Sequence, residues 1–190
     1  MPGVDRPGRF ESQLGNTKSM GYGGVRVVIL GIDPGIVSTG YGLLSVTAGQ
    51  PEVLDYGTIV IKNDFDLPSR LRGINQELVN ICGRFHPQAM AIEDIFYNKN
   101  VRTAMTVGQV RGAVVLTGVL QGLTVHSYTP LQIKQAVTGY GRADKEQLQR
   151  MLKLIFKLPE VPEPDHAADA LAAAFCHLNY DRSPIGNRVR

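Results

Sequence analysis

The chain alternates short apolar blocks with longer amphipathic ones, and this pattern predicts a mixed α/β fold. The short blocks are rich in Val, Ile and Leu and end at turn residues, which is typical of β-strands. We expect strands at 25–33, 39–46, 53–61, 88–93 and 123–127. Short linkers containing Pro34-Gly35 and Pro51 join the first three strands, which favours an antiparallel meander. The first strand runs apolar up to Asp33, as a strand buried on both faces should.

The longer blocks carry apolar residues at helical spacing. In the first of them, Leu71, Ile74 and Leu78 fall on one helix face. The helices that we expect span 67–85, 101–121, 130–138, 144–157 and 165–178. A cap for the first helix is expected at Ser69 or an adjacent residue. The order of elements favours a mixed five-stranded sheet with the meander on one side and helices on both faces.

Length and composition suit one globular domain. The chain has 190 residues, of which 43% are hydrophobic and 19% charged. Cys82 and Cys176 are far apart and outside CxxC spacing, which indicates reduced thiols in the cytoplasm. We expect no membrane span and no secretory signal. We interpret 1–24 as a disordered leader or an expression remnant, 25–179 as the domain and 180–190 as a flexible basic tail.

Charge is distributed unevenly along the chain. The segment 97–157 holds nine basic and two acidic residues, so its net charge is +7, while the whole chain carries +3. The remainder is therefore net acidic. A basic half beside an acidic half indicates a polyanionic partner close to a carboxylate site. Solvated helix faces explain the charge alone equally well.

Acids stand where apolar elements end. Asp33 ends the first strand and Glu93 ends the fourth, while His166 and Asp169 lie three apart on one face of the last helix. If that helix crosses the sheet, its first turn meets both strand ends. Carboxylates that close repel unless cations offset their charge, and oxygen ligands suit Mg²⁺. Two such ions about 4 Å apart can activate water and stabilise a leaving oxygen in phosphoryl transfer.

Each of these residues also has an ordinary explanation. Asp33 before Pro-Gly could be a turn residue, and Glu93 could be an exposed strand end. Asp165 directly precedes the last helix and fits an N-cap, and His166 could be a surface residue. The joint pattern of acids at two strand ends and at a helix start favours the metal site.

Five motifs in order carry a resemblance to a known family. They are 31-GIDPG-35, 39-TGYG-42, 92-IEDIF-96, 108-GQVRG-112 and 166-HAADALA-172. Over about 25–178 the chain resembles the RuvC family of Holliday junction resolvases. The resemblance implies a ribonuclease-H-like nuclease domain and a homodimer, in which each subunit uses divalent metal to nick one of two opposed strands. It also implies 5′-phosphate and 3′-hydroxyl ends, a role in recombination and repair, and partnership with a RuvA/RuvB branch-migration complex.

The resemblance implies that Asp33, Glu93, His166 and Asp169 are the catalytic, metal-binding residues. Many family members have Asp where this chain has His166. A neutral imidazole could ligate a metal or act as a proton shuttle, and both roles stay open. It removes one negative charge and favours Mn²⁺ as a substitute for the two Mg²⁺ ions. Asp165 points roughly 100° away around the helix, so we do not expect it to be a ligand.

Candidate DNA contacts lie in the basic half of the chain. Phe96 matches an aromatic that the family places at the junction crossover, although core packing would also explain it. Lys134 and Lys145 match basic residues that the family places near the scissile phosphate. The segment 139–144 is either a flexible loop at the DNA face or an ordinary turn between helices. Further contacts are expected from Tyr97, Lys99, Arg102 and Arg142.

The expected helix at 101–121 combines small residues with an apolar stripe. The stripe could pack on the sheet or meet a symmetry mate, as this region does in the family. Two rival functions have a basis in the sequence. The motifs at 31–35 and 39–42 also resemble the first phosphate loop of the actin, Hsp70 and sugar-kinase superfamily, but that fold needs a second loop and a longer chain. A ribonuclease-H-like nuclease acting on another nucleic acid remains the nearer alternative.

Overall fold

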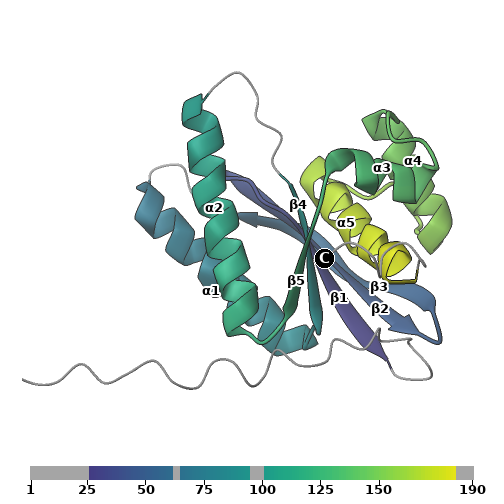
Figure 1. Cartoon of the computed structure of the whole chain (residues 1–190), viewed down its shortest axis with the longest axis horizontal. Coiled ribbons are helices and arrows are strands. Elements are labelled where there is room, and N and C mark those ends of the chain that lie inside the picture. Colours follow the sequence, from purple (N-terminus) through teal and green to yellow (C-terminus); the bar gives the residue numbers. More distant parts are fainter. Residues whose placement is uncertain (1–25, 62–64, 95–100, 183–190) are drawn as a thin grey trace, which may run out of the picture.

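The computed structural model describes residues 26–61, 65–94 and 101–182, and its centre is one five-stranded sheet (Figure 1). The strands are β1 (Val27–Asp33), β2 (Ser38–Thr47), β3 (Gln50–Val60), β4 (Ala89–Glu93) and β5 (Thr124–Tyr128). Their order is β3-β2-β1-β4-β5. Strands β1 to β3 form an antiparallel meander, whereas β4 and β5 run parallel to β1. The predicted mixed sheet and meander are confirmed.

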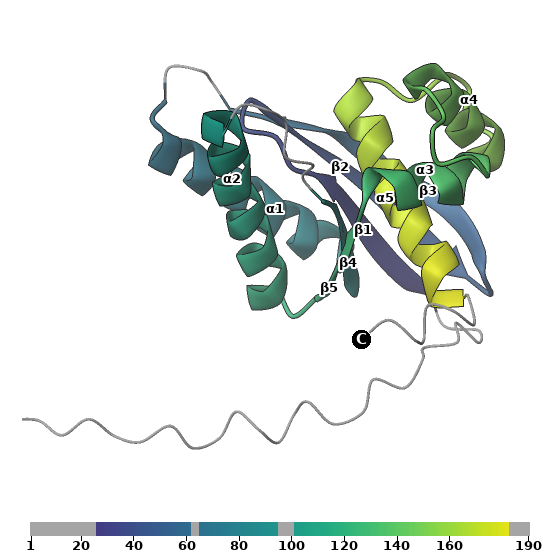
Figure 2. The same ribbon diagram turned by 45° about the horizontal axis from the view of Figure 1, so that its top comes forward.

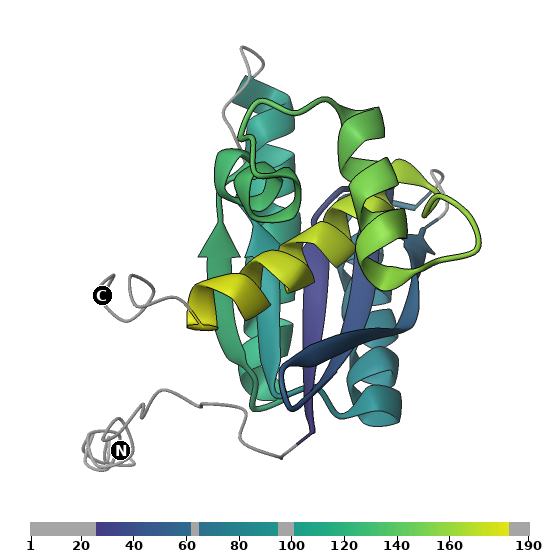
Figure 3. The same ribbon diagram turned by 90° about the vertical axis from the view of Figure 1, so that its right-hand side faces the viewer.

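Helices cover both faces of the sheet, as expected (Figures 1 and 2). The helices are α1 (Leu67–Phe85), α2 (Val101–Leu120), α3 (Pro130–Thr138), α4 (Lys145–Phe156) and α5 (Asp165–Arg182). Helices α1 and α2 lie on one face, while α5 crosses the other beneath α3 and α4 (Figure 3). Strand β1 is buried on both faces because Val27 and Ile29 pack towards α5, while Leu30 and Ile32 pack towards α1 and α2.

Two helix starts differ in detail from the sequence expectation. Asp66 caps α1 by accepting a hydrogen bond from the backbone N–H of Ser69 at 3.0 Å, so the cap is the acid and not Ser69 itself. Asp165 is the first residue of α5, and the carbonyl of Pro164 accepts the N–H groups of Ala167 and Ala168 instead. The expected capping role of Asp165 is therefore not seen, because its side chain bonds elsewhere.

Three glycines allow α5 to lie directly on the sheet. Gly31 of β1 and Gly42 of β2 are paired in register, and Gly40 pairs with Asp33. A Cβ at Gly31 would overlap the carbonyl of Ala170, and one at Gly42 would lie 2.7 Å from the backbone nitrogen of Leu171. A Cβ at Gly40 would overlap the carbonyl of His166, so these glycines set how closely the first turns of α5 approach β1 and β2.

Helix α2 has a face that its own chain leaves uncovered. Val110, Val114 and Thr117 are buried towards the sheet. By length and composition alone the helix could cross a membrane over Thr103–Leu120. This is a weak indication, because core helices of soluble proteins share both properties. The large exposed apolar residues of α2 are Met105, Leu116, Val119 and Leu120.

Both cysteines are free and buried, as the sequence indicated. The expected leader, residues 1–24, lies outside the described residues. Helix α5 continues to Arg182, into the segment expected to be a tail, and the rest of that segment lies outside the described residues.

Candidate active site

Two neighbouring parallel strands carry the first two acids to one edge of the sheet. Ile32 of β1 pairs with Ile92 of β4, so the next residues, Asp33 and Glu93, end their strands side by side. Side chains alternate along a strand, and Gly31 and Ala91 two residues earlier face α5. Asp33 and Glu93 therefore point to the α5 face as well.

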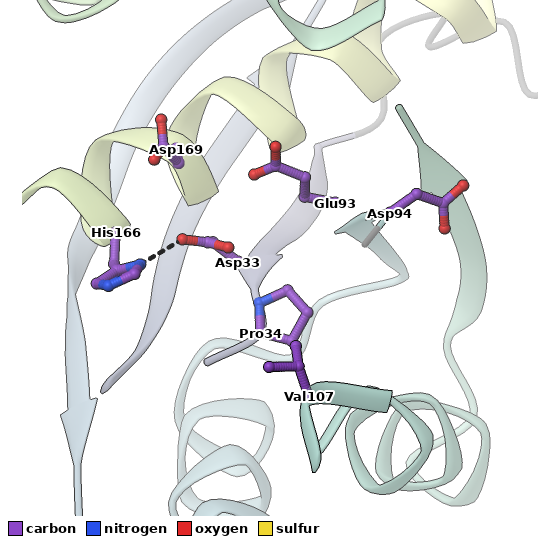
Figure 4. A pocket seen from close by; sticks show the side chains of 7 residues that line it. All are labelled: Asp33, Pro34, Glu93, Asp94, Val107, His166 and Asp169. Carbon is purple, nitrogen blue, oxygen red and sulfur yellow. Dashed lines mark hydrogen bonds and ion pairs between the residues drawn. The ribbon is translucent and has the colours of Figure 1, made fainter. Parts of the chain in front are cut away.

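Helix α5 brings the third acid to the same place. Ligand oxygens of Asp33, Glu93 and Asp169 all lie within 4.8 Å of one another (Figure 4). The expected meeting of two strand ends with the first turns of the last helix is thus seen. Close backbone contact between α5 and the glycines of β1 and β2 holds this arrangement.

His166 contacts the cluster through Asp33. Its Nδ1 lies 2.6 Å from Oδ2 of Asp33 (Figure 4), and 48% of its side chain is exposed. When Asp33 is ionised its oxygens only accept, so Nδ1 of His166 donates, and in a neutral imidazole Nε2 then carries the lone pair. The imidazole is thereby positioned for either role that the sequence left open.

The carboxylates influence one another's protonation. Burial raises the pKa of Glu93 to about 8, with further increases from the nearby charges of Asp33 and Asp169. Burial likewise raises the pKa of Asp169 to about 6, with the charge of Asp33 adding to the effect. Such shifts are expected where buried carboxyl groups lie close to other acids, because both burial and like charge disfavour the ionised form.

Two lysines partly offset the acids. Nζ of Lys145, at the start of α4, lies 3.0 Å from Oδ2 of Asp165 and 3.8 Å from Oδ2 of Asp169. Burial opposes the charge of Lys145, but its contacts with these two acids leave its pKa above the ordinary value. The charge of Lys134 also lowers the pKa of Glu93. Asp165 bonds Lys145 and Gln149 and does not join the three carboxylates.

The three clustered carboxylates and His166 line a hollow in the protein surface (Figure 4). It is lined by Asp33, Pro34, Glu93, Asp94, Val107, His166 and Asp169.

The structure locates some of the expected DNA contacts. Arg142 is exposed in the turn between α3 and α4. In that turn, the Thr138 hydroxyl accepts a hydrogen bond from the N–H of Tyr140 and donates one to the carbonyl of Tyr140. Phe96, Tyr97, Lys99 and the side chain of Arg102 lie outside the described residues, and their roles remain predictions.

One cluster beside the site was missed by the sequence reasoning. Asp94 follows Glu93 but points away from the other acids (Figure 4), and it pairs with Arg111 of α2. Arg111 also donates to the hydroxyl of Ser127. Strand alternation could have shown that two consecutive acids point to opposite faces, but the sequence does not show which cation meets the second.

Comparison with known proteins identifies the family. A family model described as crossover junction endodeoxyribonuclease RuvC matches residues 29–177. The chain belongs to the RuvC family. It is 45% identical over 164 residues to RuvC of Desulforamulus reducens, covering 86% of this chain and 100% of that protein. It is 48% identical over 153 residues to RuvC of Halothermothrix orenii, covering 80% and 93% respectively.

Solved structures agree with the family assignment. Thermus thermophilus RuvC in complex with a Holliday junction substrate has a TM-score of 0.77 and 35% identity, covering 82% of this chain and 95% of that one. A yeast mitochondrial Holliday junction resolvase is 14% identical with a TM-score of 0.61, and this likeness shows the fold alone. The RuvC neighbours confirm the expected ribonuclease-H-like fold.

Proposed function

We propose that this protein is a cytoplasmic, structure-selective endonuclease that resolves four-way DNA junctions during recombination and repair. The observation that carries the proposal is the convergence of Asp33, Glu93 and Asp169 at one edge of the sheet in a RuvC family chain. The solved Thermus thermophilus relative is in complex with a Holliday junction substrate, which supports the same substrate here.

The residues present fit divalent metal. The site offers carboxylate oxygens, which Mg²⁺ prefers, from three residues whose ligand oxygens lie within 4.8 Å of one another. We propose that Asp33, Glu93 and Asp169 hold two Mg²⁺ ions, with His166 as a further ligand or a proton carrier and with Mn²⁺ as a substitute. When bound, the ions supply activation of a water and stabilisation of the leaving oxygen.

The side chains around the carboxylates can orient the substrate. Lys134 and Lys145 place positive charge beside the acids and are suited to contact the phosphate to be cut. His166 holds Asp33 through Nδ1 and can move a proton at Nε2. In the reaction, a water oxygen bonds to phosphorus and the bond to the 3′ oxygen breaks. The products are a 5′-phosphate and a 3′-hydroxyl.

The exposed face of α2 supports a homodimer. Met105, Leu116 and Val119 are exposed, and Gly108 and Gly112 lie on the same helix at spacings of three and four residues. A symmetric dimer on this face would present two sites to the near-twofold axis of a junction and yield paired nicks. We also propose that the dimer works with a RuvA/RuvB branch-migration complex.

The basic half of the chain supplies the proposed DNA surface. Phe96 would stack on unpaired bases at the crossover. Lys99, Arg102 and Arg142 would bind phosphates, so affinity should follow junction shape and fall with salt. Tyr97 is a further candidate contact beside Phe96.

The test is nicking of a labelled four-way junction beside a linear duplex of the same sequence, with Mg²⁺ present. The expected result is nicks in two opposed strands of the junction, with ends that ligase seals. Asp33→Asn should abolish nicking while keeping junction-selective binding, because it removes a ligand and not the DNA surface. Equal cleavage of the duplex would contradict the proposal and favour a nuclease of another substrate class.

A further inference from the structure

Glu93, the last residue of β4, and Asp94, the residue after it, point to opposite sides of the sheet. Glu93 points to the α5 face and belongs to the carboxylate cluster. Asp94 points towards α2, as Met90 and Ile92 do four and two residues earlier. Figure 4 shows the two carboxylates turned away from each other. Both nevertheless line the same hollow.

Arg111 holds Asp94 in its outward position. One terminal nitrogen of Arg111 lies 2.7 Å from Oδ1 of Asp94 and 2.6 Å from Oγ of Ser127. The backbone N–H of Asp94 also donates to the carbonyl of Tyr128 at 2.8 Å. Arg111 of α2 therefore links the C-terminal ends of β4 and β5, through the residue that follows Glu93.

This ion pair is better shielded than an ordinary surface pair. The side chains of Arg111 and Asp94 are 31% and 38% exposed. Nε of Arg111 is buried and has no hydrogen-bond partner among the described residues. Partial exclusion of water strengthens the attraction between the two groups and favours one fixed geometry.

We propose that Arg111 is a positioning residue for the metal site, acting through Asp94 on Glu93. This inference rests on the proposed metal-dependent function. Metal ligands need placement to about 0.5 Å, and groups that orient ligands typically change metal affinity or activity about 10–100-fold when removed. Without Arg111, the Asp94 carboxylate is unpaired at the rim of the hollow, where it can turn towards bound cations and displace the adjoining Glu93.

The test compares Arg111→Met, Asp94→Asn and the double variant with Arg150→Met. Arg150 makes an exposed pair with Glu146 on α4 and serves as the matched arginine control. Mn²⁺ binding to the DNA-free protein is measured by electron paramagnetic resonance, and the Mg²⁺ concentration for half-maximal junction nicking is measured in parallel. Melting temperature is recorded for every variant.

Arg111→Met should weaken Mn²⁺ binding by about 10–100-fold, while Arg150→Met leaves it unchanged. Asp94→Asn should recover much of the loss in the double variant, because the unpaired charge is gone. If Arg111→Met does not fold, Arg111→Lys replaces it and should weaken Mn²⁺ binding several-fold, since lysine lacks the planar fork.

Two results would overturn the inference. One is an Mn²⁺ affinity of the Arg111 variant within twofold of that of the unaltered protein, with only the melting temperature lowered. Arg111 would then only stabilise the packing of α2 on the sheet. The other is a loss of Mn²⁺ binding that Asp94→Asn does not reduce. Failure of the proposed function would differ from both, because the unaltered protein would then bind Mn²⁺ without nicking junctions.

Discussion

Helices α5 and α2 are both rich in small residues, but they use them in opposite ways. In α5, Ala170 and Ala174 are fully buried and meet the backbone of β1 at Gly31. In α2, Gly108 and Gly112 are exposed, and no described atom lies within 4 Å of a Cβ built on either. Small residues thus serve close packing within the chain in α5 and leave an open face on α2. That open face is the one proposed above to bind a second copy of the chain.

Adding one methyl group to each helix contact should separate the two uses most clearly. Gly31→Ala should lower the free energy of unfolding by about 3 kcal/mol or more, because its Cβ would overlap the α5 backbone, which cannot move aside cheaply. Gly112→Ala should raise it by about 0.5–1 kcal/mol through helix propensity. Urea unfolding followed by circular dichroism measures both, and equal stability of the two variants would refute the distinction.

A charge on the open face of α2 tests the dimer. Leu116 is 58% exposed in the single chain, so Leu116→Glu should leave the fold intact. It should weaken self-association at least about 100-fold, because a carboxylate would be buried without a partner. Sedimentation velocity measures the change. Leu154→Glu is the control, since Leu154 is 70% exposed on α4. Unchanged self-association of Leu116→Glu would show that the dimer interface does not include this face of α2.

The sequence predicted the elements of both helices but not this contrast. Periodicity located α2 and α5 because both have apolar stripes, and the acids of the site were found because they end apolar elements. The exposed stripe of α2 was ambiguous, since core packing produces the same spacing. The glycines of TGYG were recognised only as a family motif, because their role depends on which helix lies above them.

The partners of charged groups were equally hidden from the sequence. Arg111 was part of the basic segment and of the motif 108-GQVRG-112, but its pairing with Asp94 was not predicted, since that depends on how α2 lies against β4. Asp165 was expected to cap α5, but Lys145 and Gln149 engage it because α4 packs beside α5. Contacts between elements distant in sequence leave no periodic signal, so these assignments require the structure.

The stability of the metal-free protein should depend on pH because of two acids on the α5 side of the sheet. Glu93 and Asp169 have pKa values raised to about 8 and about 6, so the metal-free folded protein holds protons that the unfolded chain releases. Their contribution to stability is fully present below the ordinary values of 4.5 and 3.8, and it is lost as pH rises through about 6 and about 8. Metal-free melting temperature should therefore fall over this range.

Metal affinity should increase as pH rises, because metal binding requires ionised carboxylates. Affinity for Mn²⁺ should rise by up to about tenfold per pH unit between pH 6 and 8, with release of protons. Calorimetry in two buffers of different ionisation heat measures that release. Glu93→Gln should flatten the slope. A pH-independent affinity in the unaltered protein would show that the acids are already ionised without metal.

The smallest expected effect concerns His166 of α5, which we propose as a further ligand or a proton carrier. His166→Asp should shift the ratio of Mn²⁺-supported to Mg²⁺-supported nicking several-fold towards Mg²⁺, because nitrogen is relatively the better ligand for Mn²⁺. Nicking rates of the unaltered protein and the variant at saturating concentrations of each metal measure the ratio.

The control variant must not disturb the fold. His86→Asp, at the left-handed C-cap of α1, is unsuitable, because an added acid at a helix C-terminus is itself unfavourable. His166→Asn is better, since it keeps a polar group beside Asp33 without adding charge. An unchanged metal ratio in His166→Asp would exclude the ligand role and leave the proton-carrying role, in which Nδ1 bonds Asp33 and Nε2 carries the proton.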